Sequence, residues 1–297
     1  MIAGRPVPMP PMVLDWLLDA DNPSVRYRAL VELLDRPVDD AIAQEAKALI
    51  PESAPVRKIF ARMHPEGYWL HRGIGDGVAY AHPASTHFVL AYLAELGMDR
   101  CDERVAMAVE RYLSLRAPDR PNPSRWEIPP DYRNHQSCLY AYNLRTLVLL
   151  GYRDDPRIQE RVEVLLNDAR RDGGYLCDRP SFGARTKSCI RGSIKALTAF
   201  AALPELWDTS RCQDLVDYFI RRRLYFRMSR PQEIIRGELT RTSFPFVISG
   251  SLLEPLYALS VMGYGQHPAL QEAWACLDTK RDGQGRYILD WYPTAIP

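Results

Sequence analysis

Apolar positions along the chain fall into paired helical segments of different character. The first segment of a pair is apolar on almost all sides, as in residues 138–151 and 189–203. The second, as in residues 156–171 and 210–223, has apolar residues three and four positions apart with polar residues between them. An apolar helix is expected in the interior and an amphipathic helix at the surface. Few segments alternate as strands do. The pattern therefore predicts an all-α protein built from helical hairpins.

The pairs recur along the chain at a regular interval. Two further pairs are expected at residues 84–97 with 102–116 and at residues 250–263 with 268–280. The glycines that end the first helices, Gly97, Gly151 and Gly263, fit a repeat of about 55 residues. Such hairpins must stack to bury their apolar faces. An open solenoid and a closed α-α toroid compete, and the contrast between inner and outer helices favours the toroid.

The expected domain is a single α-α toroid of the (α/α)6 type, with about six hairpins over residues 12–297. Residues 1–11 are proline-rich and are expected to form a flexible lead-in. Within the domain, Asn22-Pro23 and Asp39-Asp40 are typical helix starts, because a capping side chain or a first-turn proline stabilises the first turn.

Composition limits the class of protein. The chain of 297 residues is 46% hydrophobic and 25% charged, with a formal net charge of +1 and a pI near 7.6, which argues against a general nucleic-acid binder. Signal-peptide features and apolar runs of the ~20 residues needed to span a bilayer are absent from the sequence. The six cysteines form no compact disulfide framework. These features predict a cytoplasmic protein without a transmembrane segment.

One linking sequence resembles a known family. Asp172-Gly173-Gly174-Tyr175 is followed by a variable loop, Cys189 and an apolar helix. This resembles the repeat of the squalene cyclase and protein prenyltransferase superfamily, in which a Gly-Gly-aromatic turn joins each outer helix to the next inner one. Weaker versions are Gly67-Tyr68-Trp69, Arg223-Leu224-Tyr225 and residues 282–287. The resemblance implies an α-α barrel that holds a hydrophobic, isoprenoid-like substrate in its central cavity.

The active-site motifs of that superfamily match poorly. Closest to the Asp-x-Asp-Asp acid of the triterpene cyclases is Asp19-Ala20-Asp21-Asn22, which helix capping explains. Lys187 stands where the prenyltransferases have a zinc-ligand aspartate, two residues before the retained Cys189. We therefore expect a cyclase, lyase or isomerase rather than an ordinary prenyltransferase.

Candidate chemistry gathers at one rim of the expected toroid, where all inner helices begin. His135, Cys138, Cys177 and Cys189 should lie together there, and His87 could join them. Thiolate and imidazole are preferred zinc ligands, so a zinc cofactor is one interpretation. Four ligands would make a closed structural site, whereas three would leave a position that activates water or a substrate thiol. Buried apolar cysteines and reactive thiols are the alternatives.

Polar residues also interrupt the apolar inner helices at Tyr142, Arg145, Lys195 and Glu254. Unpaired burial would be costly, so Glu254 is expected to pair with Arg145 or Lys195. The group is either a structural salt bridge or a site whose cations bind a carboxylate or diphosphate while Glu254 acts as general acid or base. If the group is a site, an apolar pocket lined by aromatic residues would hold the rest of the substrate. The candidate lining residues are Phe88, Tyr92, Tyr140, Tyr142, Phe244, Phe246 and Trp291.

The sequence thus favours an enzyme acting on a hydrophobic small molecule. Candidate catalytic residues are His135, Cys138, Cys189, Glu254 and Tyr142, and candidate substrate-binding residues are His87, Phe88, Arg145, Lys195 and Phe246. A non-catalytic module that binds a lipid or peptide is the alternative, followed by a purely structural helical-repeat protein. The reaction, the substrate and homo-oligomer formation stay open.

Overall fold

The computed structural model describes residues 11–69, 83–114, 144–167, 170–175, 188–246 and 250–292. In these residues the regular structure is helical, and β-structure is limited to four isolated bridges. The all-α prediction is confirmed. None of the described helices is long and apolar enough to cross a bilayer.

The helices follow the predicted segments closely. They are α1 (Pro11–Leu17), α2 (Pro23–Arg28), α3 (Ala41–Leu49), α4 (Ala54–Phe60), α5 (Thr86–Glu95), α6 (Glu103–Ser114), α8 (Pro156–Asn167), α9 (Ile190–Ala201), α10 (Ser210–Arg221), α11 (Leu253–Val261) and α12 (Gln271–Asp278). Residues 144–149 are also helical. A π-helical turn, Ala29–Leu33, extends α2, and short 3-10 turns are Ile50–Glu52, Pro204–Leu206, Gly237–Thr240 and Pro268–Leu270.

Helix starts carry the predicted caps. Asn22 Oδ1 accepts a hydrogen bond from Val25 N at 3.4 Å, and Pro23 occupies the first position of α2. Asp40 Oδ1 accepts from Ile42 N and Ala43 N at the start of α3. Both side chains satisfy amides that have no partner within the helix. Asn22 therefore caps α2, which agrees with the explanation of the Asp19–Asn22 motif by helix capping.

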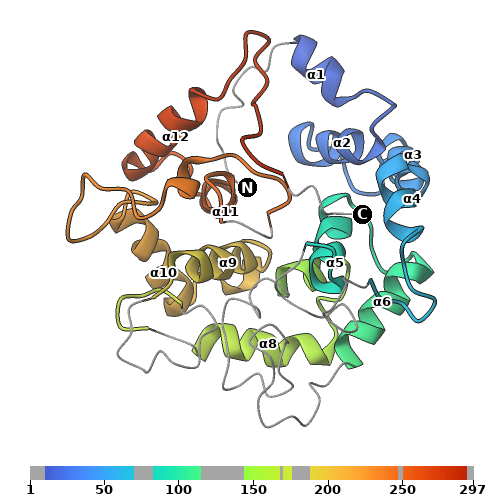
Figure 1. Ribbon diagram of the computed structural model, residues 1–297, viewed down its shortest axis with the longest axis horizontal. Coiled ribbons are helices and arrows are strands. Elements are labelled where there is room, and N and C mark those ends of the chain that lie inside the picture. The colour runs from blue at the N-terminus through green and yellow to red at the C-terminus, as the bar shows by residue number, and fades with distance from the viewer. Residues whose placement is uncertain are drawn as a thin grey trace.

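Figure 1 shows the hairpins arranged as a ring, with α5, α9 and α11 toward the centre and α6, α8, α10 and α12 around them. Every residue of α9 except Arg191 is buried, and every residue of α5 except Tyr92. The outer helix α10 buries only one face, which includes Leu215 and Phe219. α9 packs against α11 on one side and α10 on the other. The predicted contrast between inner and outer helices is confirmed.

Glycine-aromatic turns tie α4 to α5 and α8 to α9. Trp69 donates from Nε1 to Ile59 O of α4 at 2.8 Å, and from its backbone N to Thr86 Oγ1 of α5 at 3.0 Å. Tyr175 repeats the arrangement, because its hydroxyl donates to Leu165 O of α8 and its backbone N donates to Ser193 Oγ of α9 at 3.0 Å. The turn at residues 67–69 is thus a structural repeat of the one at residues 173–175.

The last described segment lies against the first helix. The Arg286 guanidinium lies 5.8 Å from the ring centre of Trp16 in α1, and Gly285 packs beside Val13. Further along, Asp290 binds Lys280 at 2.8 Å and accepts from Thr242 N at 2.9 Å. The contacts of Gly285 and Arg286 with α1 join the two ends of the helical array, which is the closed ring predicted from the sequence. Residues 1–10 lie outside the described residues, so the flexible lead-in stays a prediction.

Candidate active site inside the ring

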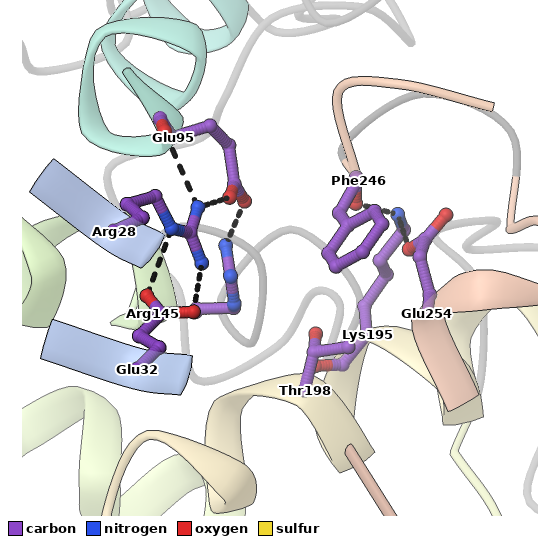
Figure 2. Close-up of polar contacts among 8 residues, drawn as sticks. All are labelled: Arg28, Glu32, Glu95, Arg145, Lys195, Thr198, Phe246 and Glu254. Carbon is purple, nitrogen blue, oxygen red and sulfur yellow. Dashed lines mark hydrogen bonds and ion pairs between the residues drawn. The ribbon is translucent and has the colours of Figure 1, made fainter. Parts of the chain in front are cut away.

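Lys195 and Glu254 form an ion pair between the inner helices α9 and α11 (Figure 2). Both side chains are fully buried. Lys195 Nζ contacts Glu254 Oε2 and also donates to the carbonyl oxygen of Phe246 at 2.6 Å. Ser251 N donates to Glu254 Oε1 at 3.1 Å, so both carboxylate oxygens have partners. The pairing of Glu254 with Lys195 was one of two predicted, and it is confirmed.

Burial moves the pKa values of this pair toward each other. Loss of water raises the pKa of Glu254, although the Lys195 charge opposes the shift. The same loss of water lowers the pKa of Lys195 to about 8, against the opposing effect of Glu254. A proton moves between an acid and a base more easily when their pKa values are similar. Shifted pairs of this kind are found where proton transfer takes place, and also in structural ion pairs.

Arg145 pairs with Glu95 at the end of α5, not with Glu254 (Figure 2). Arg28 of α2 reaches the same carboxylate, with its Nη1 donating to Glu95 Oε2 at 3.2 Å and to Glu95 O at 3.3 Å. Burial would raise the pKa of Glu95, but the charges of Arg145 and Arg28 outweigh it and hold that pKa below its usual value. Arg28 also binds Glu32, with its Nε donating to Oε1 at 2.8 Å. The second predicted partner for Glu254 was therefore wrong.

Sequence reasoning missed Glu95 and Arg28. Glu95 carried a signal like that of Lys195, a charge within an apolar inner helix, but it stands two residues before the glycine that ends the segment. Charges at helix ends usually reach solvent, so the signal was weak there. Arg28 lies in a helix with many polar residues and offered no signal.

Phe246 lies between the two ionic groups (Figure 2). Its carbonyl accepts from Lys195, and its ring centre lies 5.8 Å from the Arg145 guanidinium and 5.7 Å from the ring of Tyr257 in α11. Burial raises the pKa of Tyr257, so this phenol is neutral at ordinary pH. One aromatic residue thus contacts both charged groups.

A cavity of about 460 Å³ opens beside Glu95 and Arg28. Cavities of about 300–1,000 Å³ hold small organic ligands. Apolar and aromatic residues make up much of its wall, including Leu17, Val25, Ala29, Tyr92, Leu96 and Phe244. The rings of Tyr92 and Phe244 meet edge to face with centres 5.8 Å apart. Tyr92 and Phe244 were among the predicted aromatic lining residues.

His87 and Phe88, predicted to bind substrate, do not line this cavity. His87 Nδ1 lies 3.0 Å from the hydroxyl of Tyr112 in the outer helix α6, and the two neighbouring rings of His87 and Phe88 meet edge to face. Burial lowers the pKa of His87 to about 3, helped by the charges of Arg161 and Lys195. The imidazole is therefore neutral and packed in the core.

Of the four predicted zinc ligands, Cys189 alone lies within the described residues, and it is half-buried at the N-cap of α9. Its backbone N donates to Tyr175 O at 2.7 Å. His135, Cys138 and Cys177 lie outside the described residues, as do Tyr142, Tyr140 and Lys187. Within the described ranges, no group of three or more His, Cys, Asp or Glu residues is placed to hold a metal. The zinc centre stays a prediction.

No protein-family model and no curated protein matches the sequence. The structure is similar to solved structures of the type II terpene cyclase MstE from Scytonema. A variant of that enzyme in complex with its substrate, geranylgeranyl dihydroxybenzoate, superposes with a TM-score of 0.49 and 17% identity, over 82% of this chain and 67% of that one. A variant bound to the product merosterolic acid A gives 0.35 and 13%, over 82% of each chain. Likenesses at this level assign no activity to this chain.

Proposed function

We propose that this chain is an enzyme acting on a hydrophobic, isoprenoid-like substrate inside the helical ring, as a cyclase, lyase or isomerase. The observation that carries the proposal is the Lys195–Glu254 pair, which is fully buried among inner helices with its two pKa values shifted toward each other. The apolar, aromatic-walled cavity beside Glu95 and Arg28 supports it as a place for the hydrocarbon, although neither Lys195 nor Glu254 is among the residues that line it.

Glu254 acts as the general acid or base in this proposal. Its carboxylic acid form gives a proton to one atom of the substrate, and the resulting carboxylate takes a proton from another atom, which restores the acid. Lys195 holds the carboxylate in position and stabilises its charged form. Aromatic faces such as those of Phe246 and Tyr257 stabilise positive charge that develops on the hydrocarbon. Burial excludes water that would otherwise capture such an intermediate.

The ion pairs argue against the interior cations as a diphosphate site. Lys195 is bound by Glu254, and Arg145 is bound by Glu95. Each positive charge is therefore already balanced by a carboxylate within hydrogen-bonding contact. A diphosphate would have to displace these carboxylates or stay beside them, and both cost electrostatic free energy.

The rim centre is a separate part of the proposal. Zinc at the rim, or reactive thiols in its place, would involve Cys189 together with His135, Cys138 and Cys177. Its support is the position of Cys189 at the start of an inner helix. No step assigned to Glu254 depends on it.

Product analysis by mass spectrometry tests the proposal. The protein is incubated with prenyl alcohols and prenyl diphosphates of increasing chain length. We expect an isomerised, cyclised or dehydrated product that Glu254→Gln no longer forms at a temperature where circular dichroism shows this variant to be folded. Glu205→Gln is the matched control, because Glu205 forms an exposed ion pair with Arg153 at 3.3 Å. Binding without product would favour the lipid- or peptide-binding module. Neither binding nor product would favour a structural helical-repeat protein.

A further inference from the structure

Ser24 presents a buried hydroxyl to the cavity beside Glu95. It is the second residue of α2, it is 5% exposed, and it lines the cavity of about 460 Å³. Among the described residues its Oγ has no hydrogen-bond partner. The helix does not need this hydroxyl as a cap, because Asn22 already binds Val25 N. A buried hydroxyl without a hydrogen-bond partner is unfavourable, so this position favours a ligand or a water molecule that supplies the missing bond.

The charges of the cavity wall, Arg28, Glu32 and Glu95, are balanced when Arg145 is included, which binds Glu95 without lining the cavity. Arg28 Nε and Nη2 donate to Glu32 at 2.8 and 3.2 Å, and its Nη1 donates to Glu95. Arg145 binds the other oxygen of Glu95. These two guanidinium groups and two carboxylates sum to zero. An anionic ligand would face Glu32 and Glu95, whereas a cationic one would face Arg28, so neither sign of charge is favoured.

We propose that this cavity binds an uncharged amphiphile, whose hydrocarbon body lies against Val25, Ala29 and Phe244 and whose single hydroxyl or carbonyl oxygen hydrogen-bonds to Ser24 Oγ. A prenyl alcohol has this chemistry and a prenyl diphosphate does not. The inference deepens the proposed function by naming the substrate class, and it rests on that function in taking the bound amphiphile as the substrate. The apolar wall supplies most of the affinity, and Ser24 orients the polar end.

Calorimetric titration with three matched probes tests the proposal: a prenyl alcohol, the hydrocarbon that lacks its hydroxyl, and the corresponding diphosphate. A net hydrogen bond of about 0.5–1.5 kcal/mol makes the alcohol bind roughly 2- to 12-fold more tightly than the hydrocarbon. The diphosphate is expected to bind more weakly than the alcohol. Ser24→Ala should reduce the affinity for the alcohol to that for the hydrocarbon and leave the hydrocarbon unchanged. Ser229→Ala, at an exposed serine away from the cavity, should change neither.

The thermal stability of the free protein separates a ligand-binding role from a structural one. Ser24→Ala removes a buried hydroxyl without a partner in the described structure, so its melting temperature should equal or exceed that of the natural protein. Val25→Phe fills the cavity from a half-buried position and should weaken both the alcohol and the hydrocarbon. This second variant tests the location of binding independently of the hydroxyl.

The inference is overturned if the diphosphate binds as tightly as the alcohol, if the alcohol does not bind, or if Ser24→Ala keeps the preference for the alcohol. Turnover is read separately by mass spectrometry. Product formed from a diphosphate, with binding insensitive to Ser24, would overturn this inference and leave the enzyme proposal standing. Alcohol binding that depends on Ser24, without any product, would support binding at this cavity and contradict the enzyme proposal.

Discussion

Removing one partner of the Lys195–Glu254 pair should strongly destabilise the protein. Both side chains are fully buried, so Lys195→Met leaves a carboxylate and Glu254→Gln leaves an ammonium group without its counter-charge. Breaking a buried pair in this way costs about 3–5 kcal/mol, whereas replacing both partners with neutral residues of similar size costs far less. In the double variant we therefore expect most of the loss to be recovered, with a coupling energy of about 2 kcal/mol or more.

The two single variants should respond to pH in opposite directions. In Lys195→Met, the folded-state pKa of Glu254 stays above its unfolded value, so the folded state binds the extra proton. Its stability is then greatest at low pH and falls as pH rises through that folded pKa. In Glu254→Gln, the pKa of Lys195 lies below the ordinary 10.5, since it is about 8 even with the partner present. The unfolded state then binds more protons, so stability rises as pH increases toward 10.5.

Urea unfolding followed by far-ultraviolet circular dichroism measures these differences. The four proteins of the cycle are compared from about pH 5 to about pH 10, and the free energy of unfolding is extrapolated to water. Two results would refute the reasoning. One is a loss below about 1 kcal/mol in both single variants, which is typical of an exposed pair. The other is a pH dependence of the same sign in both, because the two isolated charges titrate in opposite senses.

Three further predictions concern the core, a turn and the rim. The pKa of His87 is about 3 when folded and about 6.5 when unfolded, so the free energy of unfolding should fall by up to about 1.4 kcal/mol per pH unit as pH drops through this interval. Urea titrations of His87→Gln should show a shallower fall with pH. An equal slope in the two proteins would contradict the assignment of this effect to His87. Gly173→Ala should lower the melting temperature more than Gly263→Ala, since both have positive φ but only at Gly173 would the new Cβ lie 2.8 Å from Asp214 O. Elemental analysis should find about one zinc per chain if the rim centre is a metal site, and Cys189→Ser should then reduce it; metal-free protein whose stability is unchanged in Cys189→Ser would rule it out.

Local rules explain why the fold could be predicted from sequence. The inner helix α9 is apolar on almost all sides and the outer helix α10 on one, and this difference alone placed them in separate layers. Capping at Asn22 and Asp40 depends on neighbouring residues only, so it could be recognised from the sequence. The equivalence of Trp69 and Tyr175 was harder to see, because an indole and a phenol make the same hydrogen bond with different atoms.

The candidate site depended on geometry that spacing does not encode. Lone charges in apolar segments identified Lys195, Glu254 and Arg145 as buried. Their pairing depends on the angles at which the inner helices face one another, so the sequence could not predict the partner of Arg145. The unpaired hydroxyl of Ser24 carries no sequence signal either, because an exposed helix-start serine looks the same.

The contact between the segment around Arg286 and helix α1 changes how the hairpins depend on one another. In a linear array the outermost units have one neighbour each, so they open first and independently. Here the first and last described elements have each other as a second neighbour. Local opening at this junction would deprive hairpins on both sides of support. Backbone amide exchange should therefore be slowed to a similar extent in all hairpins of the ring. In an open stack, by contrast, protection would decrease toward the two end hairpins.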